Sequence, residues 1–168
     1  QLTGISGNGE VVIGFASTGF SSNPMGNEQA FKCSGTGTDF VALGTLAGGN
    51  WSIARAVSSN GSVIVGQGDN ATGNQEAFVH QNGTMTGLGF LLNGSSSNAT
   101  GVSADGTIIV GYADAGGSRT HAFVYANQTM LDETEWMRSL NGPGSLTATG
   151  YNLTLLALEG AHHRPLMS

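Results

Sequence analysis

The chain has 168 residues, enough for one domain or for one array of small repeated units. Only 10% of the residues are charged, Lys32 is the only lysine and the net charge is −6, which argues against nucleic acid as a partner because phosphate binding needs clustered basic side chains. No apolar run reaches the length of a membrane-spanning helix, and the single cysteine, Cys33, excludes an internal disulfide.

Three stretches of the chain repeat one pattern. Residues 4–14, 56–66 and 101–111 each place an Asn-Gly or Asp-Gly pair before a short apolar run that ends in glycine. The step from Gly66 to Gly111 is 45 residues, and the step from Gly14 to Gly66 is 52. A period in this range is typical of an array built from one supersecondary unit.

The second unit predicts four strands in chain order. Residues 52–57 alternate as a strand does, and Asn60-Gly61 indicates a tight turn. Residues 62–66 are rich in β-branched side chains and predict a strand buried on both faces. Residues 76–80 predict a third strand and residues 84–89 a fourth. Four antiparallel strands in about 45 residues are typical of a propeller blade.

The sequence therefore predicts an all-β fold, a propeller-like array of four-stranded antiparallel blades over about residues 1–46, 51–91 and 97–132. The glycine that closes each second strand should allow a close approach of backbones. Equivalent residues of the three units should be buried, namely Phe31, Phe78 and Phe123, and Val12, Ile64 and Ile109.

The pattern stops after Met130. Residues 132–140 have the character of a short helix, with acidic residues early and Arg138 late, and residues 152–158 are strand-like. Residues 133–168 are thus expected to form a short helix and a strand tail that covers an exposed edge of the array. Three units are few for a closed ring, so a partial fourth blade over 145–168, or self-association of two chains, would be needed to close one.

The repeats resemble the extracellular HAF-repeat family, named for a His-Ala-Phe that stands here at residues 121–123, with an Asp-Gly turn before a Val-Val-Gly-like strand at residues 105–111. The first two units carry Gln and Glu in place of the histidine. The tail over residues 158–166 is similar to the segment that precedes the β-barrel translocator of some bacterial autotransporters with these repeats. The resemblance implies an exported passenger domain at the outer-membrane surface or outside the cell, with a C-terminal translocator in the full-length protein.

Many autotransporter passengers are parallel β-helices, and that is the alternative fold. The Asn-Gly and Asp-Gly hairpins count against it, because the coils of a β-helix run parallel without tight hairpins.

The candidate binding residues lie in loops. The connections between second and third strands, residues 15–27, 67–75 and 112–118, should emerge on one side and vary most between units. The residues expected to contribute to this binding face are Phe20, Asn23, Asp69, Asn70, Tyr112, Asp114 and Arg119. His80 and His121 have no cysteine or acidic partner at ligand spacing, so the sequence predicts no metal site and no cofactor.

No nucleophile elbow or other catalytic constellation is present in the sequence. The leading functional hypothesis is a non-catalytic adhesion or binding module for a host or environmental glycan or protein. The alternative is a carbohydrate-active hydrolase or lyase that uses Asp69, Asp114 or Arg119 in a cleft.

Overall fold

A computed structural model describes residues 1–17, 28–35, 37, 39–117 and 119–134. The chain divides into two compact units, Gln1–Asp132 and Glu133–Ser168. Of the helix expected over residues 132–140, only residues 132–134 are described, and the rest of it and the strand expected over residues 152–158 lie outside the described residues. Asp132, expected to begin that helix, instead ends the last strand because it pairs with Phe123. No helix in the described part of the chain is long and apolar enough to cross a membrane.

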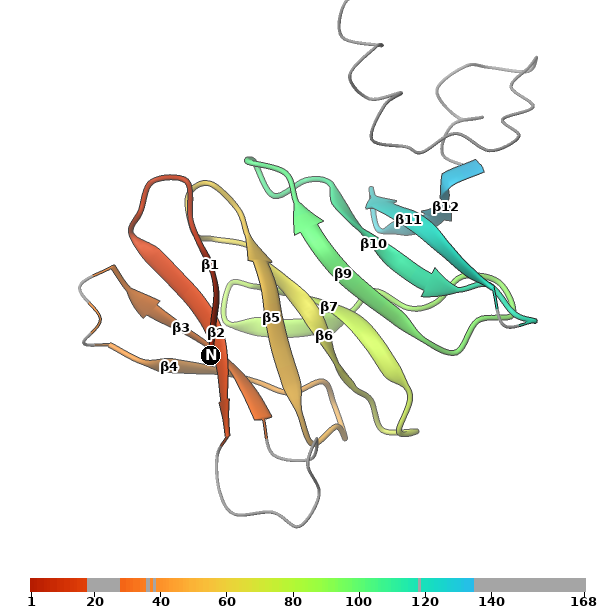
Figure 1. Cartoon of the computed structure of the whole chain (residues 1–168), viewed down its shortest axis with the longest axis horizontal. Coiled ribbons are helices and arrows are strands. Elements are labelled where there is room, and N and C mark those ends of the chain that lie inside the picture. Colours follow the sequence, from red (N-terminus) through yellow and green to blue (C-terminus); the bar gives the residue numbers. More distant parts are fainter. Residues whose placement is uncertain (18–27, 36, 38, 118, 135–168) are drawn as a thin grey trace, which may run out of the picture. The chain divides into compact units, whose positions relative to one another are not determined.

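The described residues form three four-stranded sheets, which follow one another in chain order (Figure 1). Sheet A contains β1 (Leu2–Ile5), β2 (Val11–Ser17), β3 (Glu28–Ser34) and β4 (Val41–Gly44). Sheet B contains β5 (Ser52–Val57), β6 (Ile64–Asp69), β7 (Gln75–Gln81) and β8 (Thr84–Gly87). Sheet C contains β9 (Ser97–Val102), β10 (Ile109–Asp114), β11 (Thr120–Ala126) and β12 (Thr129–Asp132).

Each sheet is an antiparallel meander in which every strand pairs with the next in sequence. This arrangement confirms the expected all-β fold of four-stranded antiparallel units. It contradicts the β-helix alternative, because a β-helix stacks parallel strands from successive coils, and every strand pair among the described residues is antiparallel.

The repeated glycine lies inside each second strand, not at its end as expected. In sheet B, Gly66 pairs with Ala54 of β5, and Arg55 is the extra residue of a β-bulge. A Cβ atom on Gly66 would lie 1.9 Å from the carbonyl oxygen of Ile53. Gly14 and Gly111 make the same approach, with 2.1 Å to the oxygen of Gln1 and 2.0 Å to that of Asn98. The glycine is therefore required for the first and second strands of each sheet to pair this closely.

The Asn-Gly and Asp-Gly pairs belong to longer turns than the tight hairpin turn that the sequence indicates. Only the glycine of each pair has a positive φ, 75° at Gly61, and the turn is held by side chains. The Ser58 hydroxyl donates to Asn60 Oδ1 (2.9 Å) and accepts from the Val63 amide (3.0 Å). The same bonds recur in the other two units, with Ser6, Asn8 and Val11 and with Ser103, Asp105 and Ile108.

The sheets pack face to face, and the first strand of each sheet lies against the preceding sheet. β5 contacts β1, β2 and β3, and β9 contacts β5, β6 and β7. One apolar cluster joins sheets A and B and a second joins B and C. The three equivalent phenylalanines are buried as predicted, as are Ile64 and Ile109. Val12 is only half-buried, because its side of sheet A has no preceding sheet among the described residues.

A buried serine, Ser52 or Ser97, bridges each junction between sheets, and we call these two residues the junction serines. The hydroxyl of Ser52 accepts from the Ala30 amide of β3 (3.0 Å) and donates to the Gly44 carbonyl at the end of β4 (2.6 Å). Ser97 repeats this with the Ala77 amide (2.9 Å) and the Gly89 carbonyl (2.7 Å). Both junctions are thus fixed by the same pair of hydrogen bonds.

The two-residue turns between third and fourth strands give a matched stability prediction. Asn82-Gly83 and Asn127-Gln128 both have positive φ at both positions, as a type I′ turn requires. Gln128 has a φ of 63°, and its Cβ atom makes this left-handed conformation unfavourable by steric repulsion, whereas Gly83 has no Cβ atom. Gln128→Gly should raise the free energy of unfolding by about 1 kcal/mol, and the reverse change, Gly83→Gln, should lower it by a similar amount. Denaturant unfolding of both variants checks this, and a destabilised Gln128→Gly protein would contradict it.

Candidate functional site

The candidate binding surface lies at the end of the sheets where the second and third strands connect. Two turns, residues 70–74 and 115–119, lie beside the segments that join one sheet to the next, residues 45–51 and 88–96, which we call the connectors. A Cβ atom on Gly48 would touch Ala71, and one on Gly116 would touch Asn93, so each connector packs on the turn of the sheet that follows it. We call the two turns and the two connectors together the loop face.

The expected loops are shorter than the sequence indicated. Gln67 to Asp69 and Tyr112 to Asp114 continue the strands β6 and β10 instead of entering loops. The Gln-Gly-Asp of the second unit is polar, yet it pairs with β7 and all three residues are buried. Pairing with neighbouring strands has overridden the local preference of these residues for a loop.

Asp69 is a buried carboxylate that holds a connector. Its Oδ1 accepts from the backbone amides of Asn50 (2.6 Å) and Trp51 (2.8 Å), and its Oδ2 accepts from the Asn50 side-chain amide (3.1 Å). These bonds compensate the cost of burying a carboxylate. Asp69 therefore positions the connector before β5, and its oxygens are not presented to solvent.

Asp114 has the same role one sheet later. Its Oδ2 accepts from the Ser95 amide and hydroxyl, both at 3.3 Å, and its Oδ1 accepts from the Gly116 amide (2.8 Å). Asp114 thus ties the second connector to the turn after β10. Asp69 and Asp114 occupy equivalent sites, at the ends of β6 and β10.

The other predicted residues are divided between turn support and exposure. Asn70 donates to Glu76 Oε2 (2.8 Å) and its Oδ1 accepts from Thr72, so its side chain builds the turn. Tyr112 is exposed, and its hydroxyl accepts from the Asn98 side-chain amide (2.7 Å). Arg119 is exposed at the end of the turn after β10. Phe20 and Asn23 lie outside the described residues, so their part in this face stays a prediction.

Sequence reasoning missed the connectors. They carry Leu92, which is 85% exposed, and the buried Leu46 and Leu91, which anchor the two segments. A signal was available, since residues 43–61 align with residues 88–106 at an offset of 45 that pairs Leu46 with Leu91 and Ser52 with Ser97.

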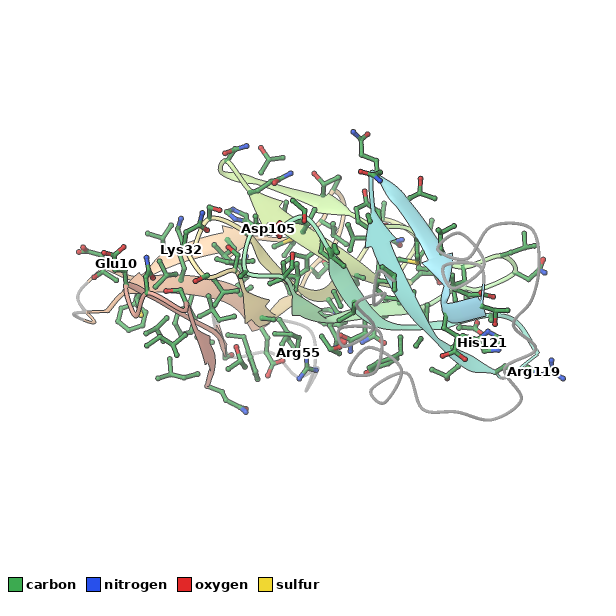
Figure 2. The ribbon with its side chains drawn as sticks, turned by 90° about the horizontal axis from the view of Figure 1, so that it is seen from above. Glu10, Lys32, Arg55, Asp105, Arg119 and His121 are labelled. Atoms are coloured by element: carbon green, nitrogen blue, oxygen red, sulfur yellow. The ribbon has the colours of Figure 1, made fainter. Side chains whose placement is uncertain are left out.

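The charged side chains are spread over the array instead of being gathered. Glu10 and Lys32 lie at the sheet A end, Arg119 and His121 at the sheet C end, and Arg55 between them (Figure 2). His121 lies 3.9 Å from Asp132, a contact between neighbouring strands that sequence spacing did not show. The described residues include no group of three or more metal-ligating side chains.

A hollow of about 340 Å³ lies in sheet A, at the opposite end of the strands from the loop face. Glu10, Lys32, Asp39 and the buried thiol of Cys33 contribute to its lining. Cys33 is a buried residue of β3.

Two titratable groups have displaced pKa values. Hydrogen bonds from the Ser103 hydroxyl and from the amide and hydroxyl of Thr107 lower the pKa of Asp105 to about 2, which keeps this turn ionised at all but strongly acidic pH. Burial of His80, with a smaller contribution from Lys32, lowers the pKa of its imidazole below 6.5.

The His80 shift predicts a pH dependence of stability. Because the folded pKa is lowered, the unfolded chain binds a proton first, and stability decreases as the pH falls below 6.5. His80→Gln removes this titration, so the unfolding temperature of the variant should change less between pH 7.5 and pH 5 than that of the wild-type chain. This holds even if the substitution changes the unfolding temperature at pH 7.5. Thermal unfolding at several pH values checks this. An unchanged slope in His80→Gln would assign the dependence to other groups.

Comparisons with known proteins extend the description of the fold only. No protein-family model and no curated protein sequence matches the chain. Among solved structures, the crystal structure of TolB from Acinetobacter baumannii is similar, with a TM-score of 0.55 and 18% sequence identity. The match covers 76% of this chain and only 30% of the TolB chain. At this identity the likeness supports the all-β architecture and carries no function across.

Proposed function

We propose that this chain is a non-catalytic binding module that recognises an extracellular glycan or protein with its loop face. The observation that carries the proposal is that hydrogen bonds and buried leucines tie both connectors of that face to the sheets. Asp69 and Asp114 bond the connectors to the second strands, and the buried Leu46 and Leu91 anchor them. A surface fixed before binding loses less conformational entropy when a partner docks.

The chemistry of the loop face suits an uncharged partner. Its exposed groups are mainly amides, hydroxyls and backbone, with Leu92 as a large apolar side chain and Arg119 as a cation. Amide and hydroxyl groups offer adaptable hydrogen bonds, while an exposed leucine supplies an apolar contact. This combination favours a sugar or a protein surface.

We infer further that the three sheets are blades of a propeller-like array in an exported protein. Successive sheets pack through equivalent residues, and the TolB likeness is consistent with such an arrangement. The resemblance to extracellular HAF repeats and to autotransporter passengers supports a location outside the cell or on the outer membrane, with a C-terminal translocator in the full-length protein.

No observation among the described residues favours the enzymatic alternative. Both carboxylates on which it relied, Asp69 and Asp114, accept hydrogen bonds that hold the connectors. A catalytic carboxylate needs at least one oxygen directed at a substrate.

The proposal is tested by charging the loop face without disturbing the fold. Leu92→Asp should weaken attachment of protein-coated beads to glycan-bearing or protein-coated surfaces by at least about tenfold, since it places a charge in a desolvated contact. Because Leu92 is 85% exposed, thermal stability should not change. Thr86→Asp, exposed on β8 outside the loop face, is the matched control. Equal attachment by both variants would count against the loop face.

A further inference from the structure

Both ends of the array present apolar faces to solvent. At the sheet C end, alternate residues of the strand β10 region lie on the outward face, and Ile108, Val110 and Tyr112 are 41%, 43% and 48% exposed. At the sheet A end, Leu2 and Ile5 of β1 are 64% and 61% exposed. On the outward face of sheet C the solvent-exposed apolar residues lie on and beside β10, whereas Val124 on the neighbouring strand β11 is buried.

The repeat shows what these faces contact elsewhere in the molecule. Val110 is equivalent to Val65 of sheet B and Ile13 of sheet A, and both of those side chains are fully buried against the next sheet. The residues that are open on sheet C are therefore the ones that bind a following sheet at the two existing junctions.

The outward face of sheet A carries residues whose equivalents in sheets B and C pack on the preceding sheet. Leu2 is equivalent to Ala54 and Ala99, which are fully buried against the preceding sheet. Ile5 is equivalent to Val57 and Val102, which pack on the same two clusters. The outward face of sheet A thus carries the residues that bind a preceding sheet.

The contact between neighbouring sheets also includes a valine of one sheet that packs on a turn glycine of the next. Val11 of sheet A packs on Gly61 of sheet B, where an added Cβ would lie 2.4 Å from the valine side chain. Val63 packs in the same way on Gly106 of sheet C, at 2.5 Å. The next members of these two series are Ile108 and Gly9, and no atom lies within 4 Å of a Cβ placed on Gly9.

Backbone hydrogen bonds connect the same turns. The Asn8 amide donates to the Ser59 carbonyl (2.9 Å), and the Ser59 amide donates to the Ala104 carbonyl (3.0 Å). At a third junction, the carbonyl of Gly7, which is equivalent to Ser59 and Ala104, would accept from the amide of Asp105, as at the first junction, or of Ala104, as at the second.

We propose that the outward face of sheet C binds the outward face of sheet A in a second copy of this chain. The contact joins two different surfaces, so it can be made twice between two copies and close into a ring. Six sheets fall within the four to eight blades of known propellers. Ile108 and Val110 of each copy then pack against Gly9, Leu2 and Ile5 of the other.

The test is the oligomeric state of the 168-residue chain, measured by light scattering and sedimentation at micromolar concentration. The chain should have twice the 17.0 kDa mass of one copy. Val110→Asp and Leu2→Asp should each be monomeric. An equimolar mixture of the two variants should form a one-to-one dimer, because each variant contributes the face that the other has lost. Thr86→Asp is the control that should remain dimeric.

Folding of the variants is checked by circular dichroism, and Ile108→Asp replaces Val110→Asp if the latter unfolds. Four results would overturn the proposal. These are a monomeric wild-type chain, dimers that persist in the single variants, a mixture that stays monomeric, or assemblies larger than a dimer. Dimerisation that appears only after removal of residues 133–168 would assign the face to the tail instead.

Discussion

The hydrogen bonds of the junction serines are the interaction on which the arrangement of the sheets depends. Each serine satisfies an amide of the third strand of one sheet and a carbonyl at or just after the end of its fourth strand. Since both backbone groups are buried at the junction, an alternative packing that left them unpaired would cost about 1–3 kcal/mol for each group. The apolar clusters supply affinity between sheets, and the serines fix which residues face each other.

A glycine with positive φ begins each connector. After each of the first two sheets, the chain turns into a connector at Gly44 or Gly89, with φ of 81° and 82°. The equivalent residue after sheet C is Thr134, and a β-branched side chain strongly disfavours positive φ. The backbone shape that begins the first two connectors is therefore strongly disfavoured at Thr134.

Much of the fold could be predicted from the sequence, because turn glycines and alternating apolar residues report on local backbone geometry. The four-strand pattern of each sheet in the described residues, the buried phenylalanines and the three-fold repeat follow from such signals. The bulge at Arg55 could not be predicted, since it depends on how closely Gly66 approaches Ile53. The candidate site was only partly predictable for a similar reason. The sequence around Asp69 predicts an exposed loop carboxylate. Its burial and its hydrogen bonds depend on how the connector packs against it.

Hydrogen exchange at the Ala77 amide tests the central claim most directly. In the wild-type chain this amide should exchange only through global unfolding, because its acceptor is the buried Ser97 hydroxyl. Ser97→Ala should accelerate its exchange by at least about tenfold relative to amides in the centre of β6, as expected for the loss of a buried hydrogen bond. Ser96→Ala, one residue earlier, should leave it protected. Equal protection of Ala77 in the wild-type chain and in Ser97→Ala would show that the apolar contacts alone hold the sheets together.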